Sequence, residues 1–147
     1  YGAAIDVHTV LYPGAVAAVE ALRSAGTQVA ICTNKPEGLA VALTARLGIR
    51  DLFGALIGAD TLPVRKPDPA PYRVAMERVG IAPHHAIAFE DSPSGVTAAT
   101  RAGIPTLGLR SSLSHDHLTA AGAVGTLSDF TDPALAPWID RITKETT

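Results

Sequence analysis

The chain has 147 residues, of which 47% are hydrophobic and 18% charged, and its formal net charge is −2. These values exclude a disordered chain and give no electrostatic reason to expect nucleic acid or an anionic membrane as a partner. No apolar run is long enough to span a membrane, and no signal-peptide pattern is present. The single cysteine, Cys32, excludes an internal disulfide. We therefore expect one cytoplasmic domain over residues 1–147.

Short apolar runs alternate with helix-like segments along the chain. Residues 1–11 are ambiguous, and in chain order the rest predicts a helix at 16–25, a strand at 28–32, a helix at 39–47, a strand at 53–57, a helix at 72–79, a strand at 85–89, a helix at 96–102, a strand at 106–109, a helix at 116–121, a strand at 124–127 and a helix at 133–142. The strands show little polar alternation, which is typical of a sheet covered on both faces. This order predicts an α/β fold, a Rossmann-like three-layer parallel sheet with helices on both faces.

Two adjacent carboxylates, Glu90 and Asp91, follow the apolar run at 85–89 and precede the next helix. In a parallel sheet this position is the carboxyl edge, where ligands bind. Two neighbouring acids repel each other unless a cation lies beside them, and hard oxygen ligands suit Mg²⁺. The alternative is that both acids only cap the helix that follows.

Two further polar groups stand in loops that follow or separate the predicted strands. Thr33 and Asn34 follow the strand at 28–32 and precede a helix, so they could bind an anion or simply cap that helix. Lys66 lies in a loop stiffened by four prolines between residues 63 and 71. Its ammonium suits a phosphate or a carboxylate, although an isolated lysine is more often a solvated surface group.

Three motifs occur in a fixed order: ICTNKP at residues 31–36, GADTLPVRKPDPAPY at 58–72 and AFEDSPSGVTAATRAGI at 88–104. Together they resemble the haloacid dehalogenase-like (HAD) phosphatase superfamily, and within it the phosphoglycolate phosphatase and β-phosphoglucomutase branch. The resemblance extends from residue 12 to about residue 108.

The resemblance implies a role for each matched residue. Thr33 corresponds to the hydroxyl that binds the transferring phosphoryl group, and Asn34 lies where the family often adds a donor. Lys66 corresponds to the lysine that neutralises the phosphoryl oxygens and the nucleophile. Asp91 corresponds to the main Mg²⁺ ligand of this part of the fold, and Glu90 to its acidic neighbour in the mutase-like members. The implied catalytic residues are thus Thr33 and Lys66.

The aspartate nucleophile of the family is not evident. It lies in an Asp-x-Asp-Gly-Thr motif on the first strand, and the most similar segment here is Asp-Val-His-Thr at residues 6–9. This segment could be a decayed form of the motif, with His8 in the position of the general acid and base. We favour the other interpretation, in which residues 1–12 are the end of the helical cap and the first strand is absent. Upstream residues or another chain would then supply the central strand, and this chain alone would bind Mg²⁺ weakly and be inactive.

The predicted function is a Mg²⁺-dependent phosphate monoester hydrolase that acts through an aspartyl-phosphate on a small phosphorylated metabolite. The alternatives are a non-catalytic domain that binds phosphate or a partner, and a sugar-phosphate mutase. Other reactive residues are expected to be structural. Cys32 is expected to be a buried thiol, and His115 and His117 are expected at the solvated start of a helix.

Overall fold

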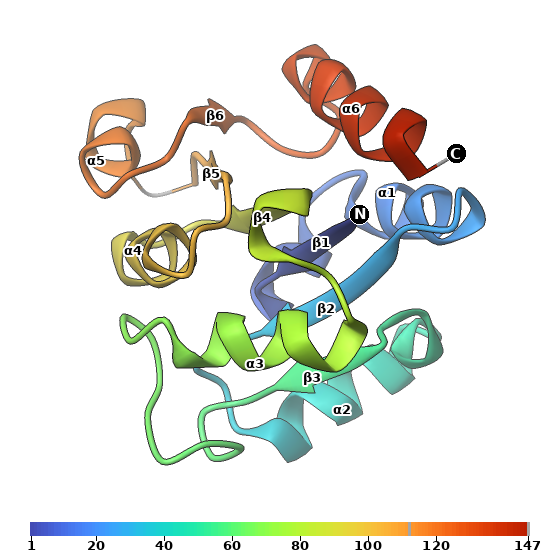
Figure 1. Cartoon of the computed structure of the whole chain (residues 1–147), viewed down its shortest axis with the longest axis vertical. Coiled ribbons are helices and arrows are strands. Elements are labelled where there is room, and N and C mark those ends of the chain that lie inside the picture. Colours follow the sequence, from blue (N-terminus) through green and yellow to red (C-terminus); the bar gives the residue numbers. More distant parts are fainter. Residues whose placement is uncertain (112, 147) are drawn as a thin grey trace.

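The computed structural model describes residues 1–111 and 113–146, and these form one six-stranded parallel sheet with helices on both faces (Figure 1). The strand order is β3-β2-β1-β4-β5-β6. The strands are β1 (Gly2–Ile5), β2 (Gln28–Cys32), β3 (Ala55–Ile57), β4 (Ala86–Glu90), β5 (Thr106–Leu109) and β6 (Gly125–Leu127). Every neighbouring pair is parallel, so the predicted Rossmann-like α/β class is confirmed.

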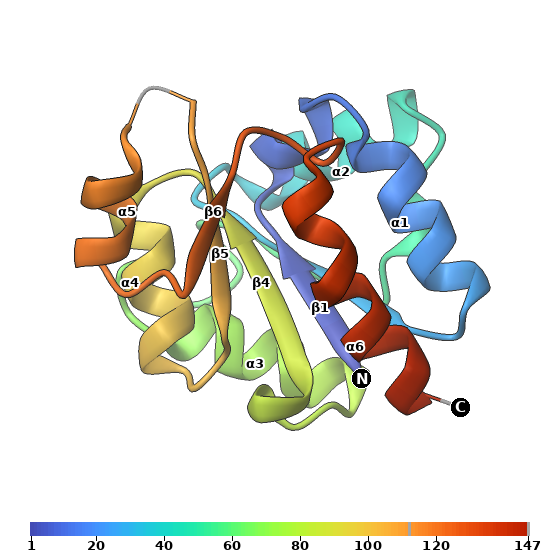
Figure 2. The same ribbon diagram turned by 90° about the horizontal axis from the view of Figure 1, so that it is seen from above.

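Helices cover the two faces of the sheet in two groups (Figure 2). The helices are α1 (Ala15–Ser24), α2 (Glu37–Arg46), α3 (Ala70–Val79), α4 (Pro93–Arg101), α5 (His115–Ala120) and α6 (Ala136–Thr146). Short 3-10 helices are η1 (Val7–Leu11), η2 (Arg50–Leu52), η3 (Pro83–His85) and η4 (Pro133–Leu135). None of the helices in the described ranges is long and apolar enough to cross a bilayer.

The strands contribute side chains to two hydrophobic cores, one on each face of the sheet, because successive side chains point to opposite faces. On β1, Ala3 and Ile5 join the core under α1 and α6, whereas Ala4 joins the core under α3 and α4. The second core is rich in alanine, which lets α3 and α4 approach the sheet closely. The glycine that ends α3, Gly80, has a φ of 72°, a left-handed conformation that terminates a helix without strain.

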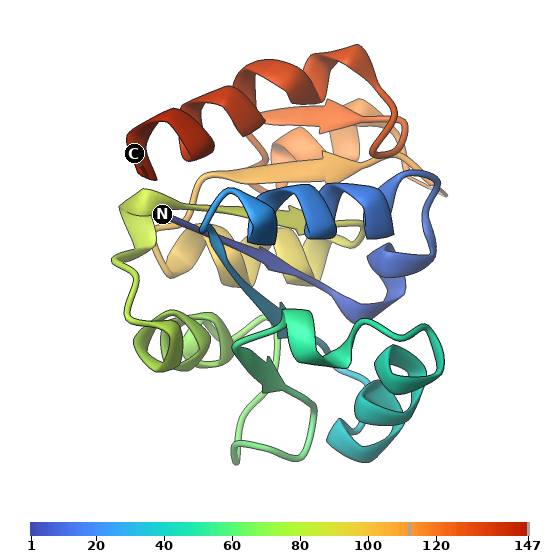
Figure 3. The ribbon, with the colours of Figure 1, turned by 90° about the vertical axis from the view of Figure 1, so that its right-hand side faces the viewer.

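The N-terminal segment differs from the sequence-based expectation. Residues 2–5 form β1, which lies between β2 and β4 at the centre of the sheet (Figure 3). In the register of the strands, Ala4 lies opposite both Ala30 and Ala88. The expectation that the first strand is absent, and must come from upstream residues or another chain, is therefore wrong. Residues 1–12 are a buried strand followed by η1 rather than the end of a helical cap. Pairing on both sides satisfies backbone groups that an empty position would leave buried and unbonded.

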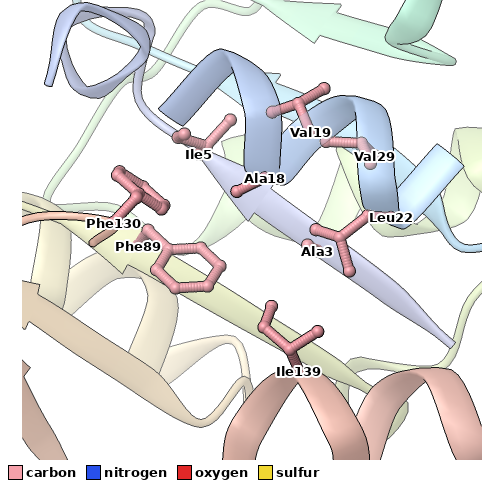
Figure 4. Close-up of a pocket in the computed structure, with 9 residues that line it drawn as sticks. All are labelled: Ala3, Ile5, Ala18, Val19, Leu22, Val29, Phe89, Phe130 and Ile139. Atoms are coloured by element: carbon pink, nitrogen blue, oxygen red, sulfur yellow. The ribbon is translucent and has the colours of Figure 1, made fainter. Parts of the chain in front are cut away.

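A small apolar cavity of about 10 Å³ lies between β1, α1 and α6 (Figure 4). It is lined by Ala3, Ile5, Ala18, Val19, Leu22, Val29, Phe89, Phe130 and Ile139. No polar surface lines this space, and a buried water needs two to four polar partners. The cavity is therefore a dry packing defect of the core, and the polar chemistry of the molecule lies elsewhere.

Candidate active site at the carboxyl edge of the sheet

Three strands deliver polar residues to the same edge of the sheet. Asp6 follows β1, Thr33 follows β2, and Asp91 follows β4. Because the strands are parallel, these residues surround one cleft at their carboxyl ends. The cleft has a volume of about 410 Å³ and is lined by Asp6, His8, Asn34, Lys35, Pro36, Leu39, Lys66, Asp91, Ser92 and Ser94.

Lys66 is the centre of the site. Its ammonium donates hydrogen bonds to Asp6 Oδ2 at 2.6 Å, to Glu90 Oε1 at 2.6 Å and to the Cys32 carbonyl oxygen at 2.9 Å. The residue is only 5% exposed. Burial by itself lowers the pKa of Lys66, but the carboxylates of Glu90 and Asp6 outweigh that effect and raise it. The side chain is therefore a permanent cation at the floor of the cleft.

Asn34 fixes the loop that carries this lysine. Its amide Nδ2 donates to the Lys66 carbonyl oxygen, and its Oδ1 accepts from the Lys66 backbone N–H, both at 3.2 Å. The two bonds clamp the loop to the end of β2. Asn34 also lines the cleft, but its amide is already used to hold the loop.

Thr33 donates to the same carboxylate as the lysine. Its hydroxyl donates to Asp6 Oδ1 at 3.3 Å and accepts from the Lys35 backbone N–H at 3.1 Å. The residue is 3% exposed. Thr33 and Lys66 therefore both contact the Asp6 carboxylate, although Thr33 is not among the residues that line the cleft.

Asp6 is a site residue that the interpretation of residues 1–12 as the end of a cap left out. Its carboxylate accepts from Lys66, from Thr33 and from the His8 backbone N–H at 2.9 Å, which also caps η1. The residue is 7% exposed. A signal was present, because Asp6 follows Gly-Ala-Ala-Ile just as Glu90 ends an apolar run.

The adjacent acids Glu90 and Asp91 have different surroundings. Glu90 is the last residue of β4, is fully buried, and accepts at Oε1 from Lys66 and from the Tyr72 hydroxyl. Asp91 lies on the cleft and accepts from the Tyr12 hydroxyl at 3.1 Å. The two acids that line the cleft are thus Asp6 and Asp91, and Glu90 faces the lysine from inside.

The donor set of the cleft suits a hard cation that keeps several water or phosphate ligands. Within the described ranges, no three His, Cys, Asp or Glu side chains converge as a metal cluster. Mg²⁺ is usually held by only one or two carboxylates together with waters and a substrate phosphate. Asp6 and Asp91 provide carboxylates of this kind, so the residues present fit Mg²⁺.

Glu90 gives the protein a defined pH dependence of stability. Burial raises the pKa of Glu90 to about 7 from 4.5, although Lys66 acts in the opposite direction. Between these pH values the folded state binds more protons than the unfolded state, so the free energy of unfolding should fall as pH rises from 4.5 to 7 and level off above 7. For one proton the slope is at most about 1.4 kcal/mol per pH unit.

Urea unfolding of the metal-free protein across this pH range measures the effect. In the Glu90→Gln variant this downward contribution should disappear, because the titrating group is gone. Parallel pH profiles for the variant and the wild-type protein would contradict the expectation.

Gly95 is required by the position of Glu90. A Cβ atom at residue 95 would overlap the Glu90 carboxylate. Gly95→Ala should therefore destabilise the protein, although alanine favours a helix interior by about 1 kcal/mol over glycine. Urea unfolding measures the change.

Gly38→Ala in α2 is the matched control, because a Cβ there meets nothing within 4 Å. It is expected to be neutral or stabilising. The cost of Gly95→Ala should vanish in a Glu90→Ala background, and a cost that persists there would contradict the steric explanation.

The remaining reactive residues lie away from the cleft or face the core. Cys32 is fully buried, and burial raises the pKa of its thiol, which confirms the expectation of a structural thiol. His115 and His117 lie exposed in the first turn of α5, where Ser114 caps the helix. They form the solvated helix start that the sequence predicted.

A family profile for haloacid dehalogenase-like hydrolases matches residues 1–103. The phosphoglycolate phosphatase of Rhodospirillum rubrum is 39% identical over 129 residues, which are 88% of this chain and 53% of that relative. A CbbY mutant of Rhodobacter sphaeroides, solved in complex with xylulose-1,5-bisphosphate, has a TM-score of 0.74 at 28% identity and covers 81% of this chain and 54% of its own. A HAD family hydrolase of Deinococcus radiodurans with bound phosphate and sodium has a TM-score of 0.75 at 26% identity, over 89% and 60% of the two chains.

The parallel sheet and these similarities place the chain among Rossmann-like α/β hydrolases. More narrowly, it belongs to the haloacid dehalogenase-like hydrolase family, whose profile covers residues 1–103 of the 147. Its relatives and structural neighbours support the phosphoglycolate phosphatase and β-phosphoglucomutase branch that the motifs predicted. The chain spans about half the length of the curated relative from Rhodospirillum rubrum.

Proposed function

We propose that the protein is a Mg²⁺-dependent phosphate monoester hydrolase that acts through an aspartyl-phosphate on Asp6. The observation that carries this proposal is the direct contact of the Asp6 carboxylate with the Lys66 ammonium and the Thr33 hydroxyl at the carboxyl edge of the sheet. Inactivity of this chain was expected because the central strand was thought to be missing. Since β1 fills that position and Asp6 directly follows it, we now expect the chain to turn over phosphate esters.

The chemistry needs a nucleophile and neutralisation of the phosphoryl charge. An oxygen of Asp6 attacks phosphorus, the ester P–O bond breaks, and the leaving alkoxide takes a proton. His8 lines the cleft beside Asp6 and is the group we assign to donate that proton. It then accepts a proton from the water that attacks the aspartyl-phosphate, which releases inorganic phosphate and restores the carboxylate. Lys66 offsets the negative charge on the phosphoryl oxygens throughout.

Asp91 and Asp6 are the residues that would hold Mg²⁺. When bound, the ion supplies positive charge against the phosphoryl oxygens. The Tyr12 hydroxyl donates to Asp91 and fixes the orientation of that carboxylate. We do not assign Glu90 as a ligand, because its carboxylate is engaged by Lys66 and Tyr72 inside the protein.

The proposed substrate is a small phosphorylated metabolite. A cleft of about 410 Å³ suits a molecule of this size, and several relatives are named phosphoglycolate phosphatase. With a net charge of −2, the chain offers no general attraction for nucleic acid. We propose the cytoplasm as the location, since phosphorylated metabolites of this kind are found there.

The test is release of inorganic phosphate from p-nitrophenyl phosphate and from phosphoglycolate, with Mg²⁺ and with excess EDTA. Release that requires Mg²⁺ supports the proposal. Binding of inorganic phosphate without any release would favour a non-catalytic phosphate-binding domain. Movement of a phosphoryl group within a sugar phosphate, without free phosphate, would instead favour a mutase.

A further inference from the structure

The buried side of Lys66 is built from groups that the proposed reaction does not use. Glu90 Oε1 accepts from both the Lys66 ammonium and the Tyr72 hydroxyl. Glu90 and Tyr72 are each fully buried, and Tyr72 lies in α3, which follows the loop that carries Lys66. One segment of chain thus supplies both the lysine and the hydroxyl that fixes the counter-ion of that lysine.

We propose that Tyr72 is a positioning residue that acts through Glu90 to hold the Lys66 ammonium against Asp6. The inference rests on the proposed function, because it gives Tyr72, which lies outside the cleft, a role in that reaction. It is supported by the geometry of the ammonium, whose three hydrogen bonds go to Asp6, Glu90 and the Cys32 carbonyl oxygen. An ammonium has only three donors, so its direction depends on where these acceptors stay.

Glu90 needs a second partner to stay in place. Among the described residues its Oε2 has no hydrogen-bond partner, so Oε1 carries the whole polar contact of the carboxylate. Gly95 leaves the space into which Oε2 projects. Without the Tyr72 hydroxyl, Lys66 alone would restrain the carboxylate, and the lysine and its counter-ion could shift together.

The aromatic ring contributes separately from the hydroxyl. The Lys66 ammonium lies 5.8 Å from the centre of the Tyr72 ring, within the range of a cation–π contact. The ring also fills the core with Ala75 and Met76. Tyr72→Phe keeps the ring and its packing and removes the hydroxyl alone, so it separates positioning from core filling.

The experiment compares wild-type protein with Tyr72→Phe, using p-nitrophenyl phosphate and Mg²⁺ well below the melting temperature. Loss of a hydrogen bond to a charged group should lower kcat about tenfold and leave KM within about twofold. In parallel, the ¹H–¹⁵N signal of the Lys66 ammonium should shift and broaden, since the cation is less firmly held. Tyr1→Phe is the matched control, because Tyr1 stacks on His85 at the opposite edge of the sheet and should change neither readout.

The two readouts separate this inference from the proposed function. If the wild-type protein shows no turnover, the proposed function fails, and the ammonium signal alone decides the role of Tyr72. An unchanged signal together with unchanged kcat would overturn the inference and leave Tyr72 as a core residue. A double-mutant cycle adds a third check: in a Glu90→Gln background, Tyr72→Phe should have no further effect on kcat, and an undiminished effect would overturn the route through Glu90.

Discussion

Asp6→Asn is expected to reduce phosphate release from p-nitrophenyl phosphate by at least about a thousandfold, because removal of a covalent nucleophile typically costs that much or more. The amide oxygen of asparagine is a poor nucleophile towards phosphorus, yet it keeps the shape of the side chain. Its Oδ1 can still accept from Thr33 and the His8 backbone N–H, whereas its Nδ2 replaces the oxygen that accepts from Lys66. Lys66 keeps its hydrogen bonds to Glu90 and to the Cys32 carbonyl oxygen, so the fold should survive. Steady-state phosphate release in the presence of Mg²⁺ measures the loss.

Asp51→Asn is the matched control, since Asp51 is an exposed acid in η2 and lies outside the cleft. It should leave turnover unchanged. If Asp6→Asn were as active as Asp51→Asn, the phosphoryl acceptor would not be Asp6. The interpretation of residues 6–9 as a decayed form of the family motif would then be wrong.

Lys66→Met is expected to lower the free energy of unfolding by about 3–5 kcal/mol, the usual cost of breaking a buried ion pair by removing one partner. Methionine has a similar length and fills the same space, so the loss reports the charge. Asp6 and Glu90, which are 7% and 0% exposed, would lose the cation between them. Urea unfolding at neutral pH measures the change, and turnover should be lost as well.

Lys35→Met provides the comparison for stability, because Lys35 is a half-buried lysine that lines the same cleft. It should change the free energy of unfolding by no more than about 0.5 kcal/mol. The penalty at residue 66 should also shrink below pH 7, where Glu90 becomes neutral, because burial raises its pKa to about 7. Equal small losses for both lysine variants would show that the buried cluster contributes little.

The sequence predicted the fold class and most of the site because these depend on local patterns. Apolar runs of four or five residues identified the strands. The residues that follow two of them identified Thr33 and Asp91, and the proline-rich loop at 63–71 identified Lys66. Glu90 was interpreted less well because the strand was predicted at 85–89 and lies at Ala86–Glu90. Glu90 is thus the last residue of the strand and not part of the loop. Since side chains alternate along a strand, it points to the same face as Ala88, which packs against α3.

Two other features depend on contacts that no local pattern shows. Gly2–Ile5 is too short a run to identify as a strand, and it becomes one because a position between β2 and β4 is available to it. Tyr72 has the sequence signature of an ordinary core aromatic in an amphipathic helix. Its hydroxyl finds a partner 18 residues away, and only the packing of α3 against the sheet brings the two together.

The location of β1 has a consequence for how the molecule resists proteolysis and truncation. Domains usually tolerate trimming of their first few residues, because those residues lie at the surface. Here Gly2–Ile5 is buried and bonded along both sides, so its loss would divide the sheet into a pair, β3-β2, and a trio, β4-β5-β6. Loss of residues 2–6 would also separate the Asp6 carboxylate from Lys66. One cleavage would therefore disrupt both the sheet and the proposed active site.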